Sequence, residues 1–288
     1  MVERPTLSLP EGELTADAAG PVDGRPVVFL HGFPQTRYTW RHQLVALGDR
    51  GFRCWAPDQR GYSAGLRPEG IEAYHVDNLV ADVGCMIDAV AAVGSAEPAS
   101  IDLVGHDWGG QVAWLFAARH PERLRSLTVL SRPHPAAFAA AFTADPGQAD
   151  RSKHHRRFDD PATADLLLEN GERRLRRMLA NSEVPAADIG AYIEVLGDRD
   201  AMDAALNWYR AATGAGLRAA DTPDVIVPTL YLWGTNDHSV GRVAAEGTAE
   251  RVSGPYRFVE IEGSGHFLTD DGASDAVTDA LVAHLAAT

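Results

Sequence analysis

The chain has 288 residues, of which 45% are hydrophobic, and this size favours one α/β domain carrying an insertion over two independent domains. A formal net charge of −14 disfavours nucleic acid and anionic membranes as partners, and no run of apolar residues is long enough to span a bilayer. The two cysteines are too few for a disulfide framework and the N-terminal residues do not resemble a signal peptide, so we expect a cytoplasmic protein, either a monomer or a homodimer.

Short β-branched runs alternate with helical stretches along most of the chain. Thr6–Leu9 and Leu14–Ala16 are expected to pair as an antiparallel edge hairpin. Further strands are expected at Val27–Leu30, Phe52–Ala56, Ile101–Val104, Leu127–Leu130, Thr229–Trp233 and Phe258–Ile261, each buried on both faces. Amphipathic helices are expected at Trp40–Leu47, Val76–Val93, Gln111–Arg119 and Ala276–Leu285. This alternation predicts a mostly parallel central sheet flanked by helices.

The pattern changes between residues 132 and 220. Strand patterns disappear there, and the segment becomes rich in Ala, Arg and Leu at helical spacing. We therefore expect a core domain in two parts, residues 1–131 and 221–288, interrupted by a helical lid over residues 132–220.

The first candidate catalytic residue is Asp107. It follows an expected strand, precedes an expected helix, and stands between Gly105 and Gly109 at the spacing of a nucleophile elbow, with Asp in the place of Ser. The strained turn and the close approach of strand and helix require small residues on both sides. The positive end of the following helix favours an ionised carboxylate at this position.

A second loop, His31-Gly-Phe33-Pro34, follows the strand at Val27–Leu30. It is expected to supply half of an oxyanion hole, with the backbone N–H groups of Phe33 and Trp108 as the two donors. The Phe33–Pro34 peptide bond is a candidate for the cis form, because functional tight turns often contain a cis proline.

Two further polar residues follow expected strands. Asp237 comes after the strand at Thr229–Trp233, and His266 comes after the strand at Phe258–Ile261 within Gly-Ser-Gly-His-Phe. The carboxyl ends of parallel strands lie at one edge of a sheet, so Asp107, Asp237 and His266 are expected to meet there. Their order along the chain is that of the nucleophile, the acid and the histidine in α/β hydrolases.

A carboxylate nucleophile restricts the reaction. Attack of Asp107 on an ester would give an anhydride, whereas attack on an electrophilic sp³ carbon gives a stable alkyl ester. Water activated by His266, with Asp237 orienting the imidazole, would then hydrolyse that ester. The substrate is therefore expected to carry a reactive C–O or C–halogen bond.

Several motifs together resemble the epoxide hydrolases of the α/β-hydrolase fold. They are His31-Gly-Phe-Pro34, Pro57-Asp-Gln-Arg-Gly-Tyr-Ser63, Gly105-His-Asp-Trp-Gly-Gly110, Asn207-Trp-Tyr-Arg210 and the distal His266. The resemblance implies an α/β-hydrolase fold with an inserted helical lid and a small-molecule epoxide as substrate. It also implies that Tyr209 assists the leaving oxygen. Trp208, Pro34 and Phe267, which neighbour these motifs, are expected to line the substrate pocket.

The sequence departs from the family pattern at one position. A second lid tyrosine usually precedes a Phe and an acidic-Pro turn, and here His154 stands at that place before Phe158. We hypothesise that His154 reaches the pocket as a second donor; a solvated histidine on a basic helix face is the alternative. No metal site and no organic cofactor are expected, since neither ligand spacing nor a nucleotide-binding motif is present.

Other functions remain open, among them a specialised hydrolase that acts on a ring of a secondary metabolite. Haloalkane and haloacid dehalogenases use the same kind of Asp nucleophile, and the indole N–H of Trp108 could bind a halide. A member of the fold that only binds a ligand is another alternative, disfavoured because all three catalytic positions are occupied.

Overall fold

The computed structural model describes residues 1–288 except 94–99, 154–156, 214–218 and 271. A nine-stranded sheet runs through the molecule in the order β1-β3-β5-β4-β6-β7-β8-β9, with β2 beside β3. The strands are β1 (Val2–Glu3), β2 (Thr6–Leu9), β3 (Gly12–Ala19), β4 (Arg25–Leu30), β5 (Phe52–Pro57), β6 (Ile101–His106), β7 (Leu124–Leu130), β8 (Thr229–Gly234) and β9 (Tyr256–Ile261). The six strands from β5 to β9 pair in parallel, whereas β1, β2 and β5 all pair antiparallel to β3.

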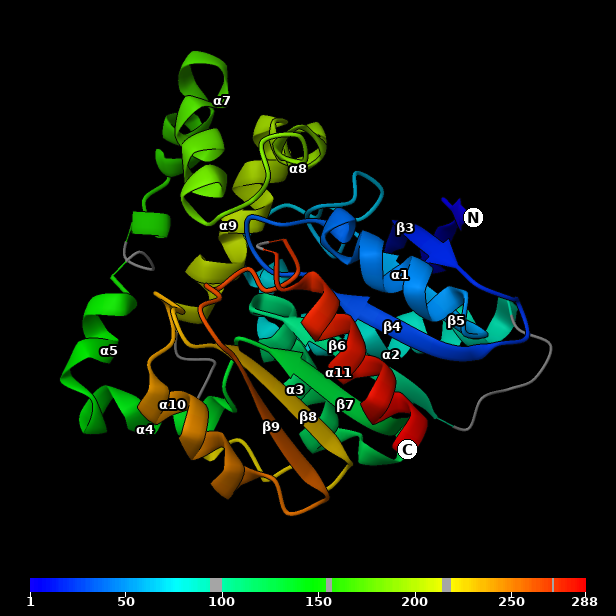
Figure 1. Ribbon diagram of the computed structural model, residues 1–288. Coiled ribbons are helices and arrows are strands. Elements are labelled where there is room, and N and C mark those ends of the chain that lie inside the picture. The colour runs from blue at the N-terminus through cyan, green and yellow to red at the C-terminus, as the bar shows by residue number, and fades with distance from the viewer. Residues whose placement is uncertain (94–99, 154–156, 214–218, 271) are drawn as a thin grey trace.

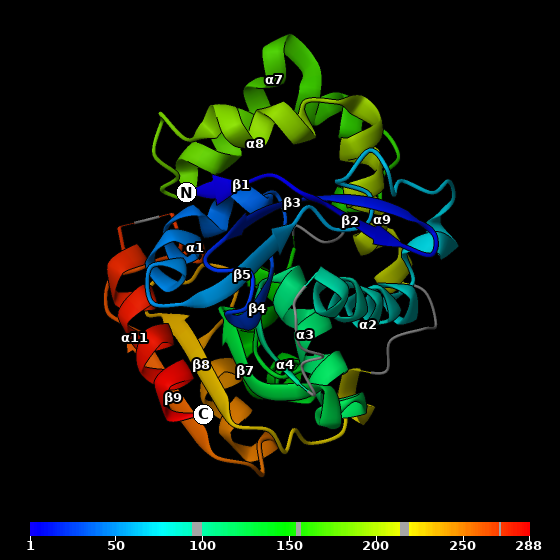
Figure 2. The ribbon, with the colours of Figure 1, turned by 90° about the vertical axis from the view of Figure 1, so that its right-hand side faces the viewer.

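Helices cover both faces of this sheet (Figures 1 and 2). The helices are α1 (Arg41–Gly48), α2 (Val76–Val93), α3 (Trp108–Arg119), α4 (Pro135–Ala144), α5 (Pro146–Arg151), α7 (Thr163–Asn181), α8 (Ile189–Leu196), α9 (Arg199–Thr213), α10 (Arg242–Gly247) and α11 (Ser274–Ala287). Helices α1 and α11 lie on one face of the sheet, and α2 and α3 lie on the other (Figure 2).

The sheet divides the hydrophobic core into two clusters. Phe29 of β4 packs with α1 and α11 in one cluster, while its neighbour Leu30 packs with α2 and α3 in the other. Alternate residues of a strand point to opposite faces, so a strand covered on both sides is mostly apolar, and any polar side chain in it needs a partner. The fully buried strand β8 is mostly apolar, whereas the equally buried β6 carries Asp102, which is bound by Arg25 and the Ser126 hydroxyl.

The expected strands and helices are all present, with ends that differ by a few residues, and the hairpin of β2 and β3 is confirmed. One expectation is wrong. Phe258–Ile261 is not buried on both faces, because β9 is the last strand of the sheet and its residues are only partly covered. Among the described residues, no helix combines the length and the apolar character needed to cross a membrane.

The helices between β7 and β8 fall into two groups. Helices α7, α8 and α9 lie together above the sheet in Figure 1. Helix α4 lies instead beside α10 at the lower edge of the core. Its start is held there by His134, whose backbone N–H donates to the Thr248 hydroxyl at 3.2 Å.

Candidate active site

Asp107 occupies the turn between β6 and α3 with a backbone φ of 50°. A positive φ is uncommon for a non-glycine residue, and such strain is typical of functional turns. Helix α3 begins at Trp108 rather than near Gln111, so its N-terminal N–H groups start directly after the carboxylate. A Cβ at Gly105 would lie 2.5 Å from the carbonyl oxygen of Gly109, so the approach of strand and helix requires glycine there.

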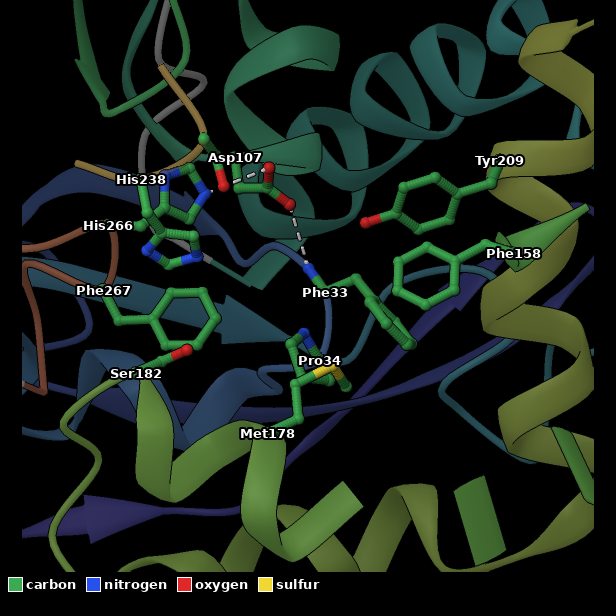
Figure 3. A pocket seen from close by; sticks show the side chains of 11 residues that line it. Phe33, Pro34, Asp107, Phe158, Met178, Ser182, Tyr209, His238, His266 and Phe267 are labelled. Atoms are coloured by element: carbon green, nitrogen blue, oxygen red, sulfur yellow. Dashed lines mark hydrogen bonds and ion pairs between the residues drawn. The ribbon is translucent and has the colours of Figure 1, made fainter. Parts of the chain in front are cut away.

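The loop after β4 supplies a donor to this carboxylate. The backbone N–H of Phe33 donates to Asp107 Oδ1 at 3.1 Å (Figure 3). Gly32 is needed beside it, because a Cβ at that position would clash with the Asp107 side chain. The Phe33–Pro34 peptide bond is cis, as predicted.

The structure brings Asp237 and His266 to Asp107. The Nδ1 atom of His266 lies 2.8 Å from Asp237 Oδ2, and its Nε2 atom lies 3.4 Å from Asp107 Oδ2. Asp237 is fully buried, and its other oxygen accepts hydrogen bonds from the backbone N–H groups of Ser239 and Val240. The imidazole is thus held between two carboxylates, one of which is fixed by backbone donors.

This arrangement changes the protonation of both partners. Burial alone would lower the pKa of His266, but the charges and hydrogen bonds of Asp237 and Asp107 outweigh it and raise the pKa to about 10. Burial alone would raise the pKa of Asp107, but the hydrogen bond and charge of His266 hold it well below its usual range. Near neutral pH the site therefore contains an imidazolium between two carboxylates.

Tyr209 of helix α9 faces this group from the other side of a cavity. Its ring packs edge-on against Trp108, with centroids 5.0 Å apart, and its hydroxyl points toward Asp107 (Figure 3). Burial, together with the nearby charge of Asp107, raises the pKa of the phenol well above its ordinary value. A weaker contribution from the neighbouring Trp108 side chain lowers this pKa. The phenol of Tyr209 is therefore held in its neutral form.

The cavity between Asp107 and Tyr209 has a volume of about 230 Å³. Its walls are mostly aromatic and aliphatic, with polar groups near Asp107. It is lined by Phe33, Pro34, Asp107, Phe158, Met178, Ser182, Tyr209, His238, Ser239, His266 and Phe267. The expected lining residues Pro34 and Phe267 are among them. In the part of the chain that the structure describes, no group of three or more His, Cys, Asp or Glu side chains is arranged to hold a metal ion.

Comparisons with known proteins identify the family of this chain. The sequence model of the α/β hydrolase fold family matches residues 25–273. The chain belongs to the α/β hydrolase family. It is 35% identical to Epoxide hydrolase A of Mycobacterium tuberculosis over 91% of each protein. This relative places the chain in the epoxide hydrolase branch of the family.

Solved structures of epoxide hydrolases have the same fold as this α/β hydrolase. One, described among novel epoxide hydrolases from metagenomes of hot environments, superposes with a TM-score of 0.85 at 32% identity and covers 99% of each chain. Epoxide Hydrolase A from Mycobacterium thermoresistibile superposes with a TM-score of 0.81 at 28% identity, covering 99% of this chain and 98% of that one.

Trp208 and His154 were also expected at the substrate pocket of this α/β hydrolase, and the structure does not place either of them in the described lining of the cavity. Among the described residues, Trp208 is not part of the cavity lining. Its indole N–H donates to the carbonyl of Arg60 at 3.0 Å, and its ring packs against Trp108 and Tyr62 behind the site. The expectation that Trp208 lines the pocket is therefore corrected. His154 lies outside the described residues, so its role as a second donor stays a hypothesis.

Sequence reasoning missed Phe158, Met178, Ser182, His238 and Ser239 in the lining of the cavity. His238 and Ser239 directly follow Asp237, so their position at the same strand end could have predicted them. Phe158 belongs to the family motif that locates His154, whereas no local signal marks Met178 and Ser182, which reach the cavity because the inserted helices pack over it. Of the two expected oxyanion donors, Phe33 bonds the carboxylate, and the role of the Trp108 backbone N–H stays a prediction.

Proposed function

We propose that this chain hydrolyses epoxides to vicinal diols through an alkyl ester of Asp107. The observation that carries the proposal is the pairing of a carboxylate at the nucleophile turn with a neutral phenol across one cavity. Asp107 Oδ1 accepts from Phe33, Oδ2 faces His266, and the Tyr209 hydroxyl points toward Asp107. This pairing suits an epoxide, because attack on its carbon releases an alkoxide that needs a proton.

In the first half-reaction an oxygen of Asp107 attacks an epoxide carbon and the C–O bond of the ring breaks. The alkoxide takes a proton from Tyr209. Formation of the ester removes the charge of Asp107, which is one of the two carboxylates that raise the pKa of His266. His266 can then lose its proton, which restores the phenol, and it becomes a neutral base.

In the second half-reaction His266 takes a proton from water, and the resulting hydroxide attacks the ester carbonyl of Asp107. The Phe33 N–H is placed to stabilise the oxyanion that forms on this carboxyl group. Collapse releases the second oxygen of the diol, which takes the proton of the new acid. Asp107 is then ionised again beside the imidazolium of His266.

The size of the cavity favours small substrates. The cavity volume is about 230 Å³. This is enough for an epoxide carrying one aromatic ring or a short alkyl chain. Met178, Ser182, Phe158 and Tyr209 come from the segment between β7 and β8, which supports the proposal that α7, α8 and α9 act as a lid.

The test traps the covalent intermediate. A His266→Gln variant is incubated with styrene oxide and, separately, with 1-bromobutane, and the mass of the peptide containing Asp107 is measured. An adduct with the epoxide, absent from a His266→Gln/Asp107→Asn control, is expected, because alkylation needs Asp107 whereas hydrolysis needs His266.

An adduct with the bromide alone would instead identify a dehalogenase. That alternative is disfavoured because a halide leaves as an anion that needs no proton, whereas a protonated phenol at Tyr209 faces Asp107 across the cavity. A third outcome would identify a binding protein. In that case neither compound forms an adduct, and an epoxide binds and is released slowly without being converted to product.

A further inference from the structure

A buried carboxylate outside the catalytic group connects four segments of the chain. Asp270 lies four residues beyond His266, and its side chain is fully buried. It accepts hydrogen bonds from the Tyr192 hydroxyl at 2.5 Å, from Gln35 Nε2 at 2.6 Å and from Arg41 Nη1 at 2.7 Å. Gln35 and Tyr192 are themselves completely buried.

The partners of Asp270 belong to segments that form the cavity. Gln35 directly follows Phe33 and Pro34, which line the cavity. Asp270 follows His266 and Phe267, which also line it. Tyr192 lies on α8, which follows the lining residues Met178 and Ser182 along the chain. Figure 3 shows Pro34, Met178, Ser182 and Phe267 together on one side of the cavity, away from Tyr209.

A second contact strengthens the connection to α8. Arg41 reaches Asp188, the residue before α8, with its other terminal nitrogen at 2.7 Å. The Tyr38 hydroxyl also donates to Asp188 at 2.8 Å, and the Arg41 guanidinium lies 4.5 Å from the Tyr38 ring centroid. The inserted helix is thus held to the core by two carboxylates that share one arginine.

These contacts have a mechanical consequence. A buried carboxylate is costly unless its donors remain in place, since each lost donor leaves charge without compensation. The donors of Asp270 come from three segments, so displacement of any one of them destabilises the arrangement of the others. The positions of α8, of the Phe33 loop and of the His266 loop are therefore coupled through one side chain.

We propose that Asp270 is a positioning residue that couples helix α8 to the loops carrying Phe33 and His266, and thereby sets the rate at which the alkyl enzyme is hydrolysed. The effect on the rate of hydrolysis rests on the proposed function, whereas the coupling of the segments does not. Hydrolysis of the ester uses His266 and the Phe33 N–H, which lie on the two loops that Asp270 joins, whereas Tyr209, the proton donor for ester formation, lies on α9 outside these contacts. Loosening the coupling should consequently slow the second half-reaction much more than the first.

The test compares Tyr192→Phe with Tyr74→Phe. Both changes remove one hydroxyl from a buried tyrosine, but the hydroxyl of Tyr74 donates to the carbonyl of Pro68, outside these contacts. In single-turnover reactions with styrene oxide, Tyr192→Phe is expected to slow hydrolysis of the alkyl enzyme about tenfold and to change its formation less than about twofold. Tyr74→Phe should leave both steps unchanged. Equal slowing of the two steps, or no slowing, would refute the proposal.

Amide hydrogen exchange tests the coupling without any substrate. Tyr192→Phe should speed exchange about tenfold in peptides around Gln35 and around residues 266–270, as well as in α8. Faster exchange confined to α8 would overturn the coupling. If the wild-type protein forms no adduct with an epoxide, the proposed function fails, and the exchange experiment still decides whether the segments are coupled.

Asp270→Asn provides a second variant, and Asp102→Asn is its control. Asp102 is also a fully buried carboxylate, bound by Arg25 and by the Ser126 hydroxyl at the start of β6. Asp270→Asn should show the same selective loss of hydrolysis, at least as large as that of Tyr192→Phe. Asp102→Asn should lower the melting temperature without separating the two steps.

Discussion

The pKa of His266 is expected to depend on the charge of Asp107. Asp107→Asn keeps the shape of the side chain and removes the negative charge whose oxygen lies 3.4 Å from His266 Nε2. The wild-type pKa is raised to about 10, and Asp107 contributes to that increase through both its charge and its hydrogen bond. The variant should therefore have a lower histidine pKa.

The size of the change follows from the distance. An opposite charge within ~4–6 Å moves a pKa by about 1–3, so the pKa of His266 should fall to roughly 7–9 in the variant. That range corresponds to about 1.4–4 kcal/mol of interaction between the two side chains. Direct Coulomb attraction at this distance is about 5 kcal/mol for an effective dielectric constant of ~20, which sets an upper bound.

Nuclear magnetic resonance of ring-labelled histidine measures this pKa directly. The chain contains 11 histidines, so the signal of His266 is assigned as the one missing from a His266→Gln spectrum. A pKa that stays near 10 in Asp107→Asn, in a protein with an unchanged melting temperature, would show that Asp107 does not hold the imidazolium. The mechanism would then lack its means of converting His266 into a base.

Three further predictions concern the same group of residues. Tyr209→Phe should slow formation of the alkyl enzyme by about 10²–10⁴-fold and leave its hydrolysis unchanged, as rapid-quench mass spectrometry would record; equal rates of formation would remove Tyr209 from the mechanism. Asp237→Asn should let the adduct form but accumulate, because the imidazole loses the partner that orients it; a variant that turns over normally would contradict this role. The raised pKa of His266 adds stability that is complete below its ordinary pKa of 6.5 and is lost as the pH rises toward about 10. Urea denaturation should therefore show a smaller loss of unfolding free energy between pH 7 and pH 10 in Asp107→Asn than in the wild type.

Residues set by local backbone geometry could be predicted from the sequence. Asp107 is marked by the glycines that let β6 and α3 approach, and Asp237 and His266 are marked by their positions after strands. Parallel strands fix where such residues meet, so three distant positions could be placed together without a structure.

Residues set by the packing of separate elements could not be predicted in this way. Trp208 and Tyr209 are neighbours on α9, and neighbouring side chains of a helix point about 100° apart, so only one of them faces the cavity. Met178 and Ser182 reach the cavity because α7 lies over the sheet, which no local pattern specifies. The same holds for Asp270, whose donors are spread over more than 150 residues of chain.

The position of α4 bears on how this enzyme could be recombined with its relatives. The segment between β7 and β8 is not one exchangeable module, because α4 buries Phe138 and Ala141 and packs against α10. A chimaera that replaces everything from residue 132 would leave α10 without its neighbour and would have to rebuild that interface. Crossing over after Arg151, where α5 ends, would exchange the helices over the cavity and keep the contact of α4 with α10, together with the hydrogen bonds of the buried Gln148 to the backbone of Ser239 and Gly241.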